Sequence, residues 1–237
     1  MVDSKLVTEM VEYYEKLATR YETKGGLNKP PSKEAVAYWD SLFACFKDKL
    51  ADRDILEIAS GTGLWTSRLA DIAKSVIATE LNESTLIESK KKPYPPGVVT
   101  FILADAYTLE NVGGPFNAGF AKDWFSHIPK SRIDEFFNVF HSKLKPGATV
   151  VISDTYQPDS RVPNEPGRFS HIDEEGNVFH NRLIPDDPNK KTWNVIKNCP
   201  SEKELRKHLK NGISNFEYHV HKTDFKHLSW YITYTVN

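Results

Sequence analysis

The sequence predicts an α/β protein with a doubly wound, mostly parallel sheet of seven strands and an antiparallel last strand. Three observations lead to this prediction. Strand-like and helix-like segments alternate five times between residues 51 and 154, polar residues follow the strands, and two β-rich runs close the chain. Ligands of such sheets bind beyond the carboxyl ends of the strands, so the polar residues there are the first candidates for a functional site.

The composition is that of one folded domain rather than a disordered chain. The 237 residues include 39% hydrophobic residues, 31 basic and 32 acidic side chains. This charge balance argues against nucleic acid as a partner, and no apolar stretch is long enough to span a membrane. The charged N-terminus is unlike a secretory signal, so we expect a cytoplasmic protein. We also expect a monomer or a homodimer. Cys45 and Cys199 match no metal spacing and are expected to be buried thiols; no metal site is predicted.

Residues 1–50 are expected to form a helical cap. Apolar and aromatic side chains recur at three- and four-residue steps over residues 3–24, as in an amphipathic helix: Leu6, Met10, Tyr13, Tyr14, Leu17 and Tyr21. Glycine and proline pairs end this pattern. A second helix is predicted over residues 32–46, with Ser32 as its N-cap.

Residues 51–154 are expected to form the ligand-binding core. Short apolar runs predict five strands at residues 54–58, 75–79, 98–103, 116–121 and 148–153. Helical spacing predicts the intervening helices at residues 64–72, 84–92 and 131–144.

The rest of the chain divides into an insertion and a closing unit. Residues 155–199 are rich in Pro, Asn, Asp and Gly, and two strands at residues 177–184 and 192–198 predict a hairpin. Long insertions of this kind usually serve as lids or binding loops. Residues 200–237 are expected to hold a helix, capped by Ser201 and Glu204, and the two closing strands.

The most specific segment is the turn after the first predicted strand, Ala59-Ser-Gly-Thr-Gly63. Five small residues between a strand and a helix let a ligand approach backbone amides at a helix N-terminus. Glu80 lies 17 residues after Gly63, near the spacing at which an acidic residue binds a ribose. The pattern predicts a nucleotide-type ligand, and a dehydrogenase-like dinucleotide domain is one alternative.

These features resemble the class I S-adenosylmethionine-dependent methyltransferases, of the small-molecule type. The family turn is Asp/Glu-x-Gly-x-Gly-x-Gly, and Glu57, Ala59, Gly61 and Gly63 stand at its four specified places, with Ala in place of the first Gly and Trp65 two residues beyond the last. The resemblance covers residues 32–154 through motifs and residues 200–237 through topology. Two helices before the first strand and a closing antiparallel pair favour this family over the dehydrogenases.

The resemblance implies S-adenosylmethionine as the cofactor and assigns its methionine end. Glu57 would hold the amino group, directly or through water, while Trp65 would narrow the pocket. The backbone closing on the methionine moiety would come from Ala59, Gly61 and Gly63. The side chains facing the methionine and methyl end would be Lys122 and Asp123.

The resemblance also assigns the nucleoside end of the cofactor. Glu80 would accept both ribose hydroxyls, which requires an anionic acceptor with two oxygens. Leu81 and Asn82 would contact the ribose or the adenine edge. Asp105 would accept the adenine amino group, with the Ala106 amide beside it.

The acceptor end is less specific. His127, six residues after the fourth strand, would border the cofactor's methyl group and act as a general base, or else pack the loop. Tyr14 and Tyr21 would contact the cofactor carboxylate or the substrate, with core packing as the alternative. In the insertion, polar residues would select an anionic acceptor or lie in solvent: His171, His180, Arg182 and Lys197. Trp193 and Phe179 would instead wall an apolar acceptor.

The expected activity is therefore methyl transfer to an oxygen or nitrogen of a small molecule, by in-line displacement under a lid. Two alternatives remain. In the first, the acceptor is a protein or RNA that the insertion binds. In the second, the chain is a non-catalytic nucleotide-binding module with the same fold.

Overall fold

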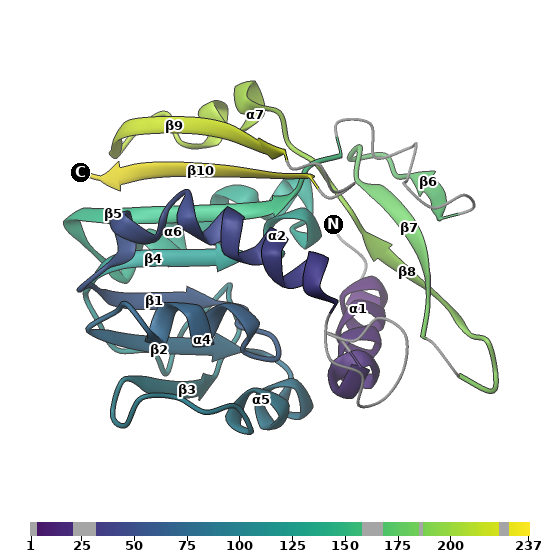
Figure 1. The fold of residues 1–237 in the computed structure, drawn as a ribbon. Helices are drawn as coiled ribbons and strands as arrows, with labels where there is room; N and C mark the ends of the chain where they lie inside the picture. Colours follow the sequence, from purple (N-terminus) through teal and green to yellow (C-terminus); the bar gives the residue numbers. More distant parts are fainter. Residues whose placement is uncertain (1–3, 21–31, 158–167, 185–186, 223–227) are drawn as a thin grey trace.

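The computed structural model describes residues 4–20, 32–157, 168–184, 187–222 and 228–237 (Figure 1). Its main sheet has seven strands in the order β3-β2-β1-β4-β5-β10-β9. The strands are β1 (Asp54–Ile58), β2 (Ser75–Glu80), β3 (Val99–Leu103), β4 (Phe116–Lys122), β5 (Leu144–Thr155), β9 (Ile213–Lys222) and β10 (Leu228–Val236). Strand β10 is antiparallel to both of its neighbours, while β1 to β5 pair in parallel. The predicted fold class is confirmed.

Helices cover both faces of this sheet. The described helices are α1 (Ser4–Leu17), α2 (Lys33–Ala44), α3 (Lys47–Leu50), α4 (Leu64–Ala70), α5 (Glu83–Lys90), α6 (Ile133–Ser142) and α7 (Glu202–His208), with short 3₁₀ turns η1 (Ala18–Arg20), η2 (Phe125–His127) and η3 (Lys130–Arg132). Alternate residues of a strand point to opposite faces. In β1, Ile55 packs in the cluster with α2 and α4, whereas Leu56 packs in the cluster with α6 and α7.

A second, smaller sheet stands beyond the carboxyl ends of the parallel strands. It consists of β6 (Phe169–Ile172), β7 (Val178–Leu183) and β8 (Thr192–Ile196), all antiparallel. Figure 1 shows α1 beside β8, past the arrowheads of β1, β2 and β4. A separate apolar cluster joins them and contains Tyr13, Ile184, Trp193 and Val195.

Several predicted boundaries are wrong for local reasons. The first helix ends at Leu17 rather than near residue 24, and one 3₁₀ turn follows. Helix α6 stops at Ser142, because Leu144 already pairs with Phe116 and begins β5. Strand β6 and helix α3 are too short for a periodic pattern to reveal. The capping box of Ser201 and Glu204 is confirmed at α7.

The two cysteine thiols differ in exposure. Cys45 is exposed, because it follows the last residue of α2, and Cys199 is half-buried. The expectation of two buried thiols is therefore wrong for Cys45. In the described part of the chain, no helix combines the length and the apolar character needed to cross a membrane.

Candidate functional site

A cavity lies where the carboxyl ends of β1, β2 and β4 meet α1 and β8. Most of the predicted site residues line it: Tyr14, Ala59, Gly61, Trp65, Glu80, Leu81, Asn82, Asp105, Ala106, Lys122, Asp123 and His127. Glu57 and Gly63 do not line it, and Tyr21 lies outside the described residues. Parallel strands place their carboxyl ends at one edge of the sheet, which is why residues far apart in sequence meet here.

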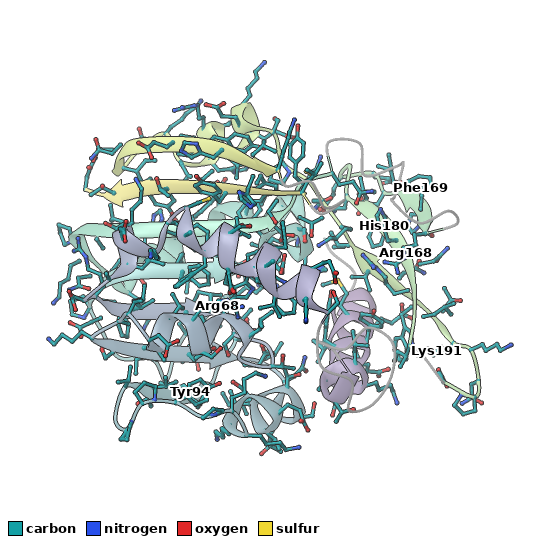
Figure 2. All side chains as sticks on the ribbon, in the orientation of Figure 1. Arg68, Tyr94, Arg168, Phe169, His180 and Lys191 are labelled. Atoms are coloured by element: carbon teal, nitrogen blue, oxygen red, sulfur yellow. The ribbon has the colours of Figure 1, made fainter. Side chains whose placement is uncertain are left out.

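The small-residue turn after β1 is held in left-handed backbone conformations. Ala59, Gly61 and Gly63 have φ values of 51°, 58° and 81°. Gly63 is required by packing, because a Cβ atom there would collide with the Ser89 and Tyr94 hydroxyls. Tyr94, labelled in Figure 2, comes from the segment before β3. The turn therefore presents Ala59 and Gly61 to the cavity and Gly63 to the protein.

Glu80 ends β2 with its carboxylate fixed by three backbone amides. Its Oε1 accepts hydrogen bonds from the amides of Leu81 and Asn82, each at 2.9 Å, and its Oε2 accepts one from Gly61 at 2.9 Å. Burial raises the pKa of Glu80, and the three amides oppose that effect. Each carboxylate oxygen has further lone pairs, so a fixed carboxylate at the cavity wall is suited to accept two hydroxyl groups.

Glu57 is a buried carboxyl group below the same turn. Only 2% of it is exposed, and its Oε2 has no hydrogen-bond partner among the described residues. Burial raises its pKa to about 8, and the charge of Glu80 adds to the effect. An unsatisfied buried carboxyl group is costly and usually has a functional partner. Because Glu57 does not line the cavity, an ammonium group of a ligand above the turn would supply the opposite charge, with water carrying the hydrogen bond.

Asp105 follows β3 and fixes the next turn. Its Oδ1 accepts the Tyr107 amide at 2.8 Å, and the Arg132 guanidinium lies 3.4 Å from the centre of the Tyr107 ring. Arg132 also binds both carboxylate oxygens of Glu135 at 2.7 Å. Tyr107 and Arg132 line the cavity beside Asp105, and neither was predicted. Arg132 reaches this wall only through tertiary structure, so no local pattern could have identified it.

Lys122 and Asp123 form an ion pair at the end of β4. Only 4% of the Lys122 side chain is exposed, and its Nζ lies 5.6 Å from the centre of the Trp65 ring. Asp123 has a φ of 58°, and its amide donates to the Ser153 carbonyl at 2.9 Å. Both side chains line the cavity next to Trp65.

His127, in η2, forms a hydrogen bond with Tyr14 of α1. The Tyr14 hydroxyl lies 2.8 Å from His127 Nε2, and His127 Nδ1 lies 2.8 Å from the Ile196 carbonyl oxygen of β8. Because a carbonyl only accepts, Nδ1 carries the proton and Nε2 accepts from Tyr14. Burial lowers the pKa of His127 well below its usual value, and Lys197 and Arg182 lower it further. The imidazole is therefore neutral, with its basic nitrogen at the cavity.

The insertion contributes less to the cavity wall than expected. Trp193 and Phe179 are buried but do not line the cavity, so the predicted aromatic wall is wrong. Trp193 instead packs against Tyr13 of α1, with ring centres 6.4 Å apart. Ile196 is the member of the described part of the insertion that reaches the cavity.

The polar residues of the insertion have varied positions. His171 is exposed and stacks on Phe179, while His180 is buried within the small sheet (Figure 2). Lys197 is neither solvated nor at the cavity, because it forms an ion pair with Asp154 at 3.2 Å. Near the start of β8, Lys191 (labelled in Figure 2) has its Nζ 3.8 Å from Oε2 of Glu12. This ion pair links the insertion to α1.

The arrangement suits a ligand with a diol, an ammonium group and a reactive end. Glu80 supplies the diol acceptor, Glu57 the buried carboxyl group, and Tyr14 with His127 a proton-accepting pair. Further polar atoms at the cavity are buried without a partner in the described structure: Ser60 Oγ, Thr85 Oγ1 and Trp124 Nε1. These donors and acceptors fit S-adenosylmethionine.

Comparison with known proteins places the site in context. A model of the methyltransferase domain matches residues 55–147. The structure is similar to DhpI bound to S-adenosylhomocysteine, with 22% identity and a TM-score of 0.71 over 98% of this chain and 97% of that one. The structure is also similar to a DhpI complex with S-adenosylmethionine and HEP, with 22% identity and a TM-score of 0.70 over 99% of this chain and 99% of that one.

A third similar structure is the magnesium protoporphyrin IX methyltransferase (ChlM) of Synechocystis PCC 6803 with bound S-adenosylmethionine. It shares 16% identity with a TM-score of 0.63, over 100% of this chain and 99% of that one. At these identities the likeness establishes a shared fold. No curated protein matches the sequence.

Proposed function

Because the chain is a methyltransferase with the class I fold of the S-adenosylmethionine-dependent enzymes, we propose that it methylates a small molecule. The methyl group passes from S-adenosylmethionine to an oxygen or nitrogen of the acceptor by in-line displacement. Helix α1 and the described part of the insertion, which includes β8, form the lid over the reacting atoms. The observation that carries this proposal is the Tyr14–His127 pair, contributed by α1 and η2 and fixed by β8.

The cavity residues divide between cofactor and acceptor. Glu80 binds the ribose hydroxyls, and Asp105 with the Ala106 amide binds the adenine edge. Glu57 and the turn at Ala59 and Gly61 hold the methionine end, where Lys122 supplies a positive charge. When bound, the cofactor supplies an electrophilic methyl group on a sulfonium. The remaining cavity wall, formed by Met10, Tyr14, Trp124, His127 and Ile196, receives the acceptor.

The protein contributes positioning, exclusion of water and a proton acceptor. Placing the two reactants in line supplies much of the acceleration in displacement reactions. Neutral His127 accepts a proton at Nε2, the nitrogen that Tyr14 now occupies. An acceptor hydroxyl either replaces Tyr14 at Nε2 or passes its proton through the Tyr14 hydroxyl. Building positive charge on His127 is opposed by Lys197 and Arg182, which both lower its pKa.

The position of the lid favours a small acceptor over a macromolecule. Helix α1 and β8 contribute Met10, Val11, Tyr14 and Ile196 to the cavity wall itself. The Lys191–Glu12 contact and the apolar cluster at Trp193 hold the two segments together. A protein or RNA acceptor would require these segments to separate before its target atom reached His127.

Calorimetric titration with S-adenosylmethionine tests the proposal at its first step. We expect one site per chain, competition by S-adenosylhomocysteine, and no binding of NAD. Absence of S-adenosylmethionine binding would contradict the enzyme assignment, and binding of NAD in its place would support the dehydrogenase-like alternative. Methyl-labelled cofactor then identifies the acceptor among fractionated small metabolites.

A further inference from the structure

A buried ion pair lies outside the cavity, next to the turn η2 that carries His127. Lys197 Nζ, at the end of β8, lies 3.2 Å from Asp154 Oδ1, near the end of β5. Asp154 is fully buried, and 12% of the Lys197 side chain is exposed. Against the effect of burial, Lys197 and Lys122 hold the pKa of Asp154 below its usual range. Buried charges of this kind persist where further hydrogen bonds satisfy them.

Both members of the pair bind Ser126, the residue before His127. Asp154 Oδ2 accepts the Ser126 amide at 2.8 Å, and Lys197 Nζ lies 2.7 Å from the Ser126 hydroxyl oxygen. The Ser126 carbonyl accepts the Asn198 amide at 2.8 Å. The amide, the carbonyl and the hydroxyl of Ser126 are thus all held by residues from β5 and from the end of the insertion.

The neighbouring residue of β8 acts on His127 directly. The Ile196 carbonyl accepts the Nδ1 proton at 2.8 Å, while Tyr14 occupies Nε2. Three consecutive residues, Ile196 to Asn198, therefore contact Ser126 or His127. The position of the Ile196 carbonyl decides which ring nitrogen is protonated, and Lys197 follows Ile196 directly.

We propose that Asp154 and Lys197 are positioning residues, which act through Ser126 to hold the His127 ring between the Ile196 carbonyl and the Tyr14 hydroxyl. This inference rests on the proposed function, since it gives His127 its place at the acceptor. The competing explanation is that the ion pair anchors only the insertion. The two explanations differ at the imidazole, because an anchor alone leaves the tautomer and the protonation of His127 unchanged.

The charges around His127 give the sign of the effect. Lys197 and Arg182, both from the insertion, lower its pKa, whereas the Ile196 carbonyl and Asp123 raise it. Tyr14 faces the ring as a neutral hydroxyl. Removing the Lys197 charge and admitting water both raise the pKa of His127. Loss of the pair should therefore move its protonation to higher pH.

The test is ¹⁵N NMR of the imidazole groups in the full chain, with the His127 signals assigned by their loss in His127→Gln. In the wild type we expect His127 to be neutral at pH 6.5 and protonated only at Nδ1. In Lys197→Met we expect a mixture of tautomers and protonation at higher pH. Lys197→Arg should retain the wild-type spectrum. Lys49→Met is the matched control, because Lys49 forms a 3.0 Å ion pair with Glu217, with both side chains about half exposed.

Loss of Lys197 leaves Asp154 buried without its partner, so the double variant Asp154→Asn, Lys197→Met provides a neutral replacement if the single variant fails to fold. Once an acceptor is known, kcat should fall on the order of 100-fold in either variant, with the KM for the cofactor unchanged. Wild-type tautomer and protonation in the folded variants would overturn the proposal. Failure of the chain to bind S-adenosylmethionine would instead contradict the proposed function, and the NMR result would be unaffected.

Discussion

The Tyr14 hydroxyl lies 2.8 Å from Nε2 of His127, although the two residues are 113 positions apart in the chain. Tyr14 comes from the N-terminal helix and His127 from the turn after β4. The family resemblance gave each residue a separate role, Tyr14 as a contact of the cofactor carboxylate or the substrate and His127 as a general base, with packing as the alternative for both. The structure shows that they form one pair, and that the insertion fixes its second nitrogen through the Ile196 carbonyl.

The pair yields a prediction for turnover. Tyr14→Phe keeps the ring but removes the hydroxyl, and we expect kcat to fall by about tenfold. His127→Asn removes the proton acceptor and should lower kcat by about 10²–10⁴-fold. Neither change should alter cofactor affinity by more than a few-fold. Tyr13→Phe is the control, since Tyr13 neighbours Tyr14 but packs in the α1–β8 cluster. Full turnover in His127→Asn would make the histidine structural.

Glu80 should dominate cofactor affinity. Glu80→Gln keeps one carbonyl acceptor but loses the charge that we propose binds the ribose, and hydrogen bonds to charged groups contribute about 1.5–3 kcal/mol. We expect the Kd for S-adenosylmethionine to rise at least tenfold, measured by calorimetry. Glu83→Gln, exposed at the start of α5, is the matched control. An unchanged Kd in Glu80→Gln would place the ribose elsewhere.

Glu57 predicts proton release when the cofactor binds. Its pKa of about 8 makes it largely protonated at pH 7 in the free protein. An ammonium group favours the carboxylate, so binding releases a proton, and affinity should rise with pH up to about 8, by at most about tenfold per pH unit. Calorimetry in buffers of different ionisation enthalpy measures the released proton.

Two variants separate the contributions of the buried carboxyl groups to this effect. Glu57→Gln should abolish the proton release and flatten the pH dependence. Glu80→Gln should retain it if Glu57 is the source. Equal proton release in wild type and Glu57→Gln would show that another group titrates.

Gly63 and Gly212 both have left-handed backbone conformations, and together they allow a controlled stability test. Their φ values are 81° and 79°, but a Cβ atom meets Ser89 and Tyr94 at Gly63 and nothing within 4 Å at Gly212. Gly212→Ala should cost about 1 kcal/mol through backbone strain. Gly63→Ala should cost about 1–3 kcal/mol more through the collision.

Thermal unfolding measures the difference, at about 2–4 °C per kcal/mol for a chain of this size. Cofactor affinity should also fall in Gly63→Ala, since the collision displaces the turn that carries Gly61. Equal losses of stability in the two variants would show that the turn adapts to the added carbon.

His141 predicts how stability depends on pH. Burial lowers its pKa to about 4, and its Nε2 lies 2.7 Å from the Tyr234 hydroxyl. The unfolded chain binds a proton near pH 6.5 and the folded chain does not, so this contribution is present at pH 7 and is lost as pH falls from about 6.5 to 4. The loss amounts to about 3 kcal/mol. Urea unfolding should show a weaker dependence on pH over this range in His141→Gln, and an equal dependence would contradict the assignment.

The strands and the residues proposed to bind the cofactor could be predicted, because strands are local patterns and the family resemblance assigns roles to the residues at their carboxyl ends. Glu80 ends β2 and Asp105 stands two residues after β3, and parallel strands bring their carboxyl ends together. The contacts that hold His127 and Ser126 could not be predicted from local patterns. The Ile196 carbonyl has no side-chain signature, and the contacts of Lys197 and Arg132 depend on how distant segments pack. Lys197 was therefore expected to select the acceptor or to lie in solvent, and Trp193 was expected to line the acceptor site.

The most direct test of the central claim is incubation of the protein with methyl-labelled S-adenosylmethionine and a fractionated cell extract. We predict that label enters a small-molecule fraction, and that His127→Asn lowers this transfer while retaining the cofactor. Label found only in protein or RNA, or no transfer by a chain that binds the cofactor, would contradict the claim that the lid encloses a small acceptor.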